Sequence, residues 1–147
     1  MRIPFRHAAY VAASLIPFLV SVAVAIPQNA PASASSTSDE SKLAGTWRGD
    51  SLRVEKGTAY HDEVAVYRIA AIPGKGGYLL VTGGKVVDGK EIVMGSGEWH
   101  YDSAKHALTG ELPRGVITFK LDGDKLEGTF VLPDKSVLRR ITLKKSD

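Results

Sequence analysis

Residues 115–145, GVITFKLDGDKLEGTFVLPDKSVLRRITLKK, decide the fold of this 147-residue chain. The stretch contains three runs of β-branched, aromatic and leucine side chains, in which apolar and polar residues alternate. In the middle run Leu126 and Phe130 share one face, whereas Glu127 and Thr129 share the other. The runs are separated by Asp122-Gly123-Asp124 and Pro133-Asp134, which are typical turn sequences. The stretch therefore predicts three consecutive antiparallel strands.

Short runs of this kind, separated by turn sequences, extend back to residue 43. Asp88-Gly89 adds a two-residue hairpin signature. The spacing of the turns predicts eight strands, at residues 45–55, 61–72, 77–87, 91–102, 106–112, 115–121, 125–132 and 136–145. No window after Leu43 keeps a helical period. Strands joined by short turns favour an all-β, up-and-down antiparallel barrel, because closure removes exposed strand edges. A two-sheet β-sandwich is the structural alternative.

The first 25 residues have the pattern of a secretory signal peptide. Arg2 and Arg6 form a positive start, residues 8–26 carry no charge, and Ala23-Val24-Ala25 has the small residues that signal peptidase accepts. We therefore expect an exported protein, periplasmic or secreted after cleavage, that meets the membrane only during export. An uncleaved membrane anchor is the alternative, since the uncharged segment approaches the length that spans a bilayer.

Residues 26–42 are rich in Pro, Ala and Ser, contain no aromatic residue, and predict a disordered linker. Residues 43–147 then form one domain. Without Arg2 and Arg6, 17 of the 19 basic side chains remain against 16 acidic ones, so the domain is nearly neutral. Such a domain has no overall field for binding phosphate backbones, and we expect no nucleic-acid partner. The chain has no cysteine, which excludes disulfides and thiolate metal sites.

Leu43-Ala44-Gly45-Thr46-Trp47 opens the first predicted strand, and Arg139-Arg140 lies in the last. This arrangement resembles the lipocalin and calycin superfamily, in which a Gly-x-Trp begins the barrel and an arginine from its final segment packs across the indole. The resemblance implies that Trp47 and an arginine close one barrel end. Arg139 is the expected partner, because it shares a strand face with Val137 and Ile141.

The resemblance also implies a non-enzymatic binding module that holds a small hydrophobic ligand in the barrel. The candidate ligand-binding residues are the aromatic side chains within the predicted strands: Tyr67, Tyr78, Trp99, Tyr101, Phe119 and Phe130. Whether these side chains line a cavity or fill a packed core stays open at this point. We expect no catalytic residue, no cofactor and no dedicated metal site.

Two alternatives concern function. The chain is also similar to small exported bacterial inhibitors of metalloproteases, which share a Leu-x-Gly-x-Trp opening and an eight-stranded barrel. That similarity implies a protein partner, with residues 26–42 as the segment inserted into the protease. The other alternative is a small metal-dependent enzyme that uses His61, His100 or His106, although nothing in their spacing is typical of a metal site.

Overall fold

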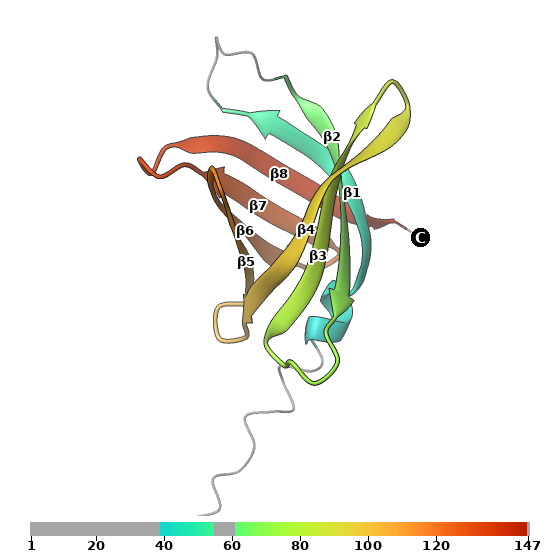
Figure 1. Ribbon diagram of the computed structural model, residues 1–147, viewed down its shortest axis with the longest axis vertical. Coiled ribbons are helices and arrows are strands. Elements are labelled where there is room, and N and C mark those ends of the chain that lie inside the picture. Colours follow the sequence, from blue (N-terminus) through green and yellow to red (C-terminus); the bar gives the residue numbers. More distant parts are fainter. Residues whose placement is uncertain (1–38, 55–60, 147) are drawn as a thin grey trace, which may run out of the picture. The chain divides into compact units, whose positions relative to one another are not determined.

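Eight antiparallel strands follow one another around a closed barrel, as Figure 1 shows. The structure is a computed structural model that describes residues 39–54 and 61–146. The strands are β1 (Gly45–Arg53), β2 (Glu63–Ala71), β3 (Tyr78–Val87), β4 (Lys90–Asp102), β5 (Ala107–Leu112), β6 (Gly115–Asp122), β7 (Lys125–Val131) and β8 (Val137–Ser146). Each lies within two residues of its predicted bounds. The up-and-down barrel is confirmed, and the β-sandwich alternative is wrong.

Pairing of the first and last strands closes the barrel. β1 lies between β2 and β8, with Trp47 opposite Tyr67 on one side and opposite Lys145 on the other. The predicted hairpin at Asp88-Gly89 joins β3 to β4, and both residues adopt positive φ angles of 50° and 75°. Positive φ at both central residues gives the turn a twist that matches the twist of the flanking strands.

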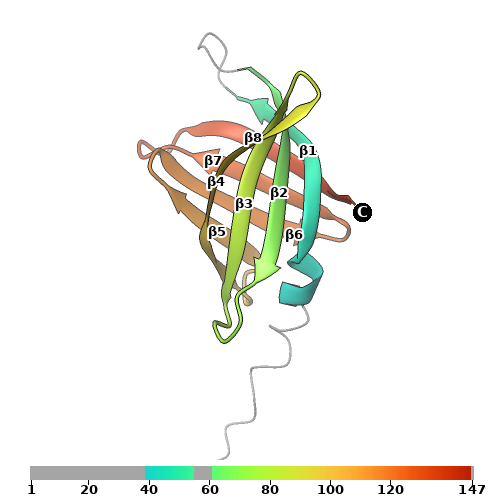
Figure 2. The same cartoon turned by 45° about the vertical axis from the view of Figure 1, so that its right-hand side comes forward.

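A helical turn of residues 39–43 precedes β1 and contacts the barrel. Composition predicts that residues 39–42 belong to the linker, but in the structure they form this turn. The Trp47 Nε1–H donates to the Leu43 carbonyl oxygen at 2.7 Å. The Lys145 ammonium donates to the Lys42 carbonyl oxygen at 2.9 Å. These bonds satisfy carbonyl groups at the end of the turn, which has no further helix to pair with them. The turn lies at one end of the barrel in both Figure 1 and Figure 2, and we call that end the closed end.

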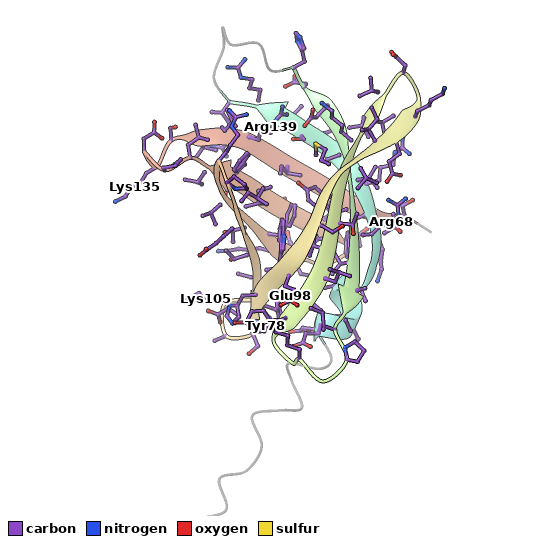
Figure 3. The ribbon with its side chains drawn as sticks, viewed as in Figure 1. Arg68, Tyr78, Glu98, Lys105, Lys135 and Arg139 are labelled. Atoms are coloured by element: carbon purple, nitrogen blue, oxygen red, sulfur yellow. The ribbon has the colours of Figure 1, made fainter. Side chains whose placement is uncertain are left out.

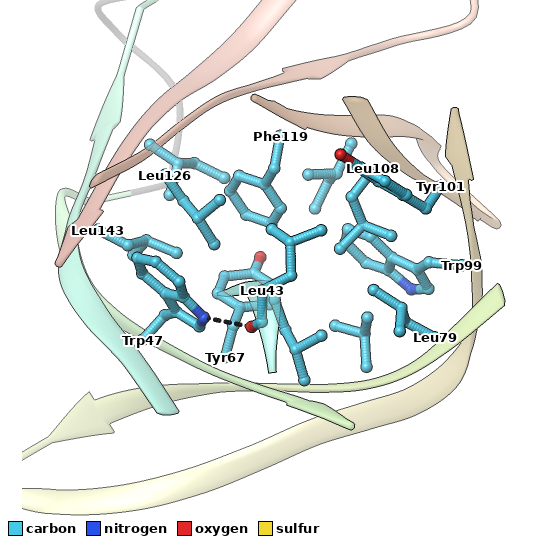
Figure 4. Close-up of a cluster of buried hydrophobic side chains, with 14 of the residues drawn as sticks. Leu43, Trp47, Tyr67, Leu79, Trp99, Tyr101, Leu108, Phe119, Leu126 and Leu143 are labelled. Carbon is cyan, nitrogen blue, oxygen red and sulfur yellow. Dashed lines mark hydrogen bonds between the residues drawn. The ribbon is translucent and has the colours of Figure 1, made fainter. Parts of the chain in front are cut away.

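The core fills the half of the barrel nearest the closed end. Its fully buried side chains include Leu43, Trp47, Phe119, Leu126 and Leu143 (Figure 4). Phe119 packs over Gly128, its partner across β6 and β7, where a Cβ atom would lie 2.4 Å from the ring. Glycine thus makes room for a large ring inside a narrow barrel.

Two bulges change the course of the strands at the opposite, open end. One shifts the β3–β4 register, so that Gly83 lies opposite Gly95 while Gly84 lies opposite Val93. Beyond this bulge the tip of the hairpin projects past the rest of the sheet (Figure 1). The other bulge, at Phe130 and Val131, leaves Leu138 as an extra residue in β8. Bulges bend a strand and redirect its side chains.

The ladder between β4 and β5 is short. Among the described residues these strands pair only at His100 with Thr109, Tyr101 with Leu108, and Asp102 with Ala107. The strands diverge from there toward the open end, as Figure 1 shows. We call this split between residues 90–99 of β4 and residues 110–112 of β5 the seam.

Candidate functional site

A cavity of about 620 Å³ occupies the open half of the barrel. Its walls are mainly apolar and come from all eight strands and the β5–β6 connection. They include Ala65, Tyr67, Val81, Met94, Trp99, Ile117, Phe130, Leu138 and Ile141. Cavities of roughly 300–1,000 Å³ with apolar walls are the usual sites for small molecules. The cavity is therefore the candidate functional site.

Three glycines leave the cavity open. Gly83, Gly95 and Gly97 all line it, on the part of the wall made by β3 and β4. A Cβ atom added at Gly95 would meet nothing within 4 Å, so this position faces empty space. The closed half is filled by leucine and aromatic side chains, whereas these three positions contribute only backbone.

Aromatic rings separate the cavity from the packed core. The Tyr67 ring meets Phe119 edge to face, with centroids 5.0 Å apart, and Trp99 stacks on Phe119 at 5.8 Å with planes 12° apart. Tyr67 and Trp99 line the cavity, while Phe119 is fully buried beside them. Burial raises the pKa of Tyr67 to about 12, and the nearby Glu63 carboxylate contributes to this shift. Tyr67 therefore stays a neutral hydroxyl across the physiological pH range.

Polar groups gather on one side of the cavity mouth. The Arg139 guanidinium is buried, with 8% of the residue exposed, and donates to the Ser51 carbonyl oxygen at 3.1 Å and to the His61 carbonyl oxygen at 3.2 Å. Its Nη1 lies 3.5 Å from Glu63 Oε1, and the Lys85 ammonium lies 3.7 Å from Glu63 Oε2. Figure 3 shows Arg139 at the open end of the barrel. Hydrogen bonds to two carbonyl oxygens and an ion pair with a carboxylate stabilise this cation away from water.

The predicted contact between Trp47 and Arg139 is wrong. Arg139 lies opposite Arg53 on β1, six residues from Trp47, which corresponds to roughly 20 Å at ~3.3 Å per residue. The cation over the Trp47 ring is Lys145, whose Nζ lies 5.5 Å from the ring centroid. Arg139 does point inward, as alternation predicts, but at the other end of the barrel, because the strands run antiparallel.

The six aromatic residues predicted to bind a ligand fall into three groups. Tyr67, Trp99 and Phe130 line the cavity. Tyr101 and Phe119 belong to the buried core of the barrel, beyond the cavity. Tyr78 does not line the cavity; it is 39% exposed on the outer surface, where its ring meets His100 edge to face at 5.2 Å. The structure thus brings three of the six together at one site.

Sequence reasoning missed most of the polar mouth. Alternation within a strand shows which residues share a face, but it does not show which residues meet across the barrel. In the structure Glu63 pairs with both Arg139 and Lys85. Ser51 carried no signal at all. An inward-facing charged residue such as Arg139 is itself a signal, because a buried cation needs an acidic partner.

The three histidines of the metal hypothesis lie apart. His61 precedes β2, His100 lies on the outer face of β4, and His106 lies in the β4–β5 turn, where its Nδ1 is 3.0 Å from Asp39 Oδ2. In residues 39–54 and 61–146, no three histidine, aspartate or glutamate side chains are grouped so as to hold a metal ion. This part of the chain also contains no helix with the length and apolar character to span a membrane.

The predicted signal peptide and most of the predicted linker lie outside the described residues. Comparison with protein-family models finds no match, and no curated protein matches the sequence. The interpretation of the candidate site therefore rests on the geometry of the cavity and its lining residues.

Proposed function

We propose that the protein is an exported, non-enzymatic binding module that holds a small, mainly apolar molecule in the open half of a calycin-like barrel. The observation that carries this proposal is the unfilled cavity of about 620 Å³, which sits beside a well-packed core. A small domain gains stability by filling its interior, so a retained apolar cavity indicates a use for the space. The resemblance to lipocalins and calycins supports the same reading.

The ligand has an apolar body and a polar end. The cavity walls are aliphatic and aromatic, whereas Ser51, Glu63 and Arg139 form a hydrogen-bonding group at the mouth. A few polar groups at a mostly apolar site orient a ligand, while burial of its apolar surface supplies most of the affinity. The polar end would then lie near Arg139.

Two tryptophans provide an internal test. Trp99 lines the cavity, whereas Trp47 is buried in the closed half. A brominated fatty alcohol quenches only an indole that it nearly contacts. In the Trp47→Phe variant, which keeps Trp99, we expect saturable quenching by this probe. In the Trp99→Phe variant, which keeps Trp47, we expect little quenching.

A cavity-filling variant completes the test. Gly95→Leu places a side chain in the empty space without a backbone clash and should weaken probe binding at least tenfold. Gly76→Leu is the matched control, because Gly76 also has free space around its Cβ position but lies in the β2–β3 connection. Equal quenching of both tryptophans, or no saturable quenching by a panel of apolar probes, would contradict the proposal.

The protease-inhibitor alternative uses a different part of the chain from the cavity. The segment that would enter a protease, residues 26–42, lies outside the described residues except for residues 39–42, which contact the barrel. Deletion of residues 26–38 distinguishes the two functions, since it should abolish protease inhibition but leave probe binding unchanged.

A further inference from the structure

The seam opens at the point where two carboxylates would meet. If the β4–β5 register continued beyond His100 and Thr109, Trp99 would lie opposite Gly110, and Glu98 would lie opposite Glu111. Like charges directly opposite each other destabilise a strand pair. In addition, the Trp99 ring packs against the Gly110 backbone, where a Cβ atom would lie 2.1 Å from the ring. The repulsion between the two carboxylates favours divergence of the strands at the seam. The ring over Gly110 does not, since Phe119 packs over Gly128 within a continuous ladder.

Divergence turns the long arm of β4 into an exposed sheet edge. Every residue from Lys90 to Ser96 is exposed, and in the described part of the chain this arm pairs only with β3. Three consecutive large apolar residues lie on it: Ile92, Val93 and Met94 are 47%, 59% and 54% exposed. Unpaired edges of this kind bind another extended chain through backbone hydrogen bonds.

The charges at the seam indicate what sort of chain fits. Glu98 and Glu111 both border the cavity and the outer surface, one on each side of the seam. Glu98 pairs with Lys75 on its own side, whereas Glu111 has no ion-pair partner among the described residues. A chain lying between β4 and β5 would place one of its side chains between these two carboxylates. Lysine or arginine suits that position, because either carries the opposite charge.

We propose that the seam binds an extended peptide segment of a partner protein, which adds a strand beside β4. The segment carries a basic side chain between Glu98 and Glu111, and its apolar side chains cover Ile92 and Met94. A second copy of this chain fits less well, because another β4 would bring its own Glu91 and Glu98 to the same acidic edge. The seam adjoins the cavity, because Met94, Glu98 and Glu111 line both. Strand addition nevertheless uses backbone groups of β4 and not the enclosed space.

The test uses the protein expressed from its full-length sequence and a labelled ten-residue peptide. The peptide alternates threonine and valine and carries one central lysine. We expect saturable binding by fluorescence anisotropy and at least tenfold slower amide hydrogen exchange within residues 95–99 and 110–112. Two control peptides should bind at least tenfold more weakly: one has glutamate in place of lysine, and the other has alternate backbone amides methylated.

Variants of the protein locate the site. Glu98→Gln combined with Glu111→Gln should weaken binding of the lysine peptide about tenfold, whereas Glu127→Gln, at an exposed position on β7, should leave it unchanged. Amide protection elsewhere, equal binding of the methylated peptide, or unchanged affinity in the double variant would overturn the proposal. Protection of the same amides without peptide, rising with protein concentration, would instead identify a second copy as the occupant. If the lysine peptide binds but no apolar probe does, the seam proposal is supported and the proposed function of the cavity is refuted.

Discussion

Replacement of Gly110 by alanine tests how Trp99 is held between the seam and the core. The new Cβ would lie 2.1, 2.3 and 2.6 Å from three atoms of the indole. Carbon atoms attract each other best at about 3.5–4.0 Å, so the ring would have to move by more than ~1 Å. Phe119, whose ring stacks with the indole at a centroid distance of 5.8 Å, restricts that movement. Overpacking of this kind costs about 1–3 kcal/mol, and we expect a loss of about 2 kcal/mol in the free energy of unfolding.

Gly95→Ala is the matched control, because it makes the same chemical change on the facing strand where nothing lies within 4 Å. Alanine is favoured over glycine inside a strand by roughly 0.5–1 kcal/mol, so this variant should gain a few tenths or more. Urea unfolding followed by circular dichroism measures both values. In a double-mutant cycle, Trp99→Phe should recover at least ~1 kcal/mol of the Gly110→Ala loss. Equal stability of the two alanine variants would refute the packing argument.

Three further predictions concern charges and titration. The folded-state pKa of Tyr67 is about 12, whereas an unfolded tyrosine titrates near ~10, so the free energy of unfolding should fall by up to about 3 kcal/mol between pH 10 and 12. Tyr67→Phe should remove that part of the decrease, measured as urea midpoints at each pH. Lys42 donates to Asp39 and lowers the pKa of that carboxyl. The stabilisation by the Asp39 carboxylate is therefore present above the ordinary aspartate pKa and disappears as the pH falls below it. Between pH 5 and pH 2 the melting temperature should decrease less for Asp39→Asn than for the wild type. Arg139→Leu should destabilise the barrel by about 3 kcal/mol, because it removes one of the two cations beside the partly buried Glu63 carboxylate and the donor to two carbonyl oxygens. Arg140→Leu, on the exposed face, should change stability by less than about 0.5 kcal/mol, and similar losses in both variants would contradict the assigned burial.

The strands were predictable because their signals are local. Alternation along β7 places Leu126 inside and Glu127 outside, and the two positive φ angles at Asp88-Gly89 follow from side chains that tolerate them. Tight turns between short strands leave few ways to pair them, so the order around the barrel follows from the order in the chain. The resemblance to lipocalins implied that Trp47 lies beside the last strand, and it does, but Lys145 takes the place expected for Arg139.

The candidate site was only partly predictable. An aromatic residue at an inward position can line a cavity or fill the core, and the sequence pattern is the same for both. The structure separates Trp99, which reaches the cavity, from Phe119, which packs over Gly128 in the core. The inward direction of Arg139 was predictable, but its height in the barrel depends on the β1–β8 register, which no local signal specifies.

Composition and alternation alone therefore established an all-β chain of eight strands with an apolar interior, because each residue's preference for a strand, a turn or a buried face depends on its near neighbours. Three-dimensional packing was needed to show that the barrel is filled at one end and hollow at the other, and that β4 and β5 separate beyond His100. These features depend on how neighbouring strands pack: the Trp99 indole lies against Gly110, and β4 and β5 do not pair at Glu98 and Glu111. Such contacts exist only after the register of every strand has been set.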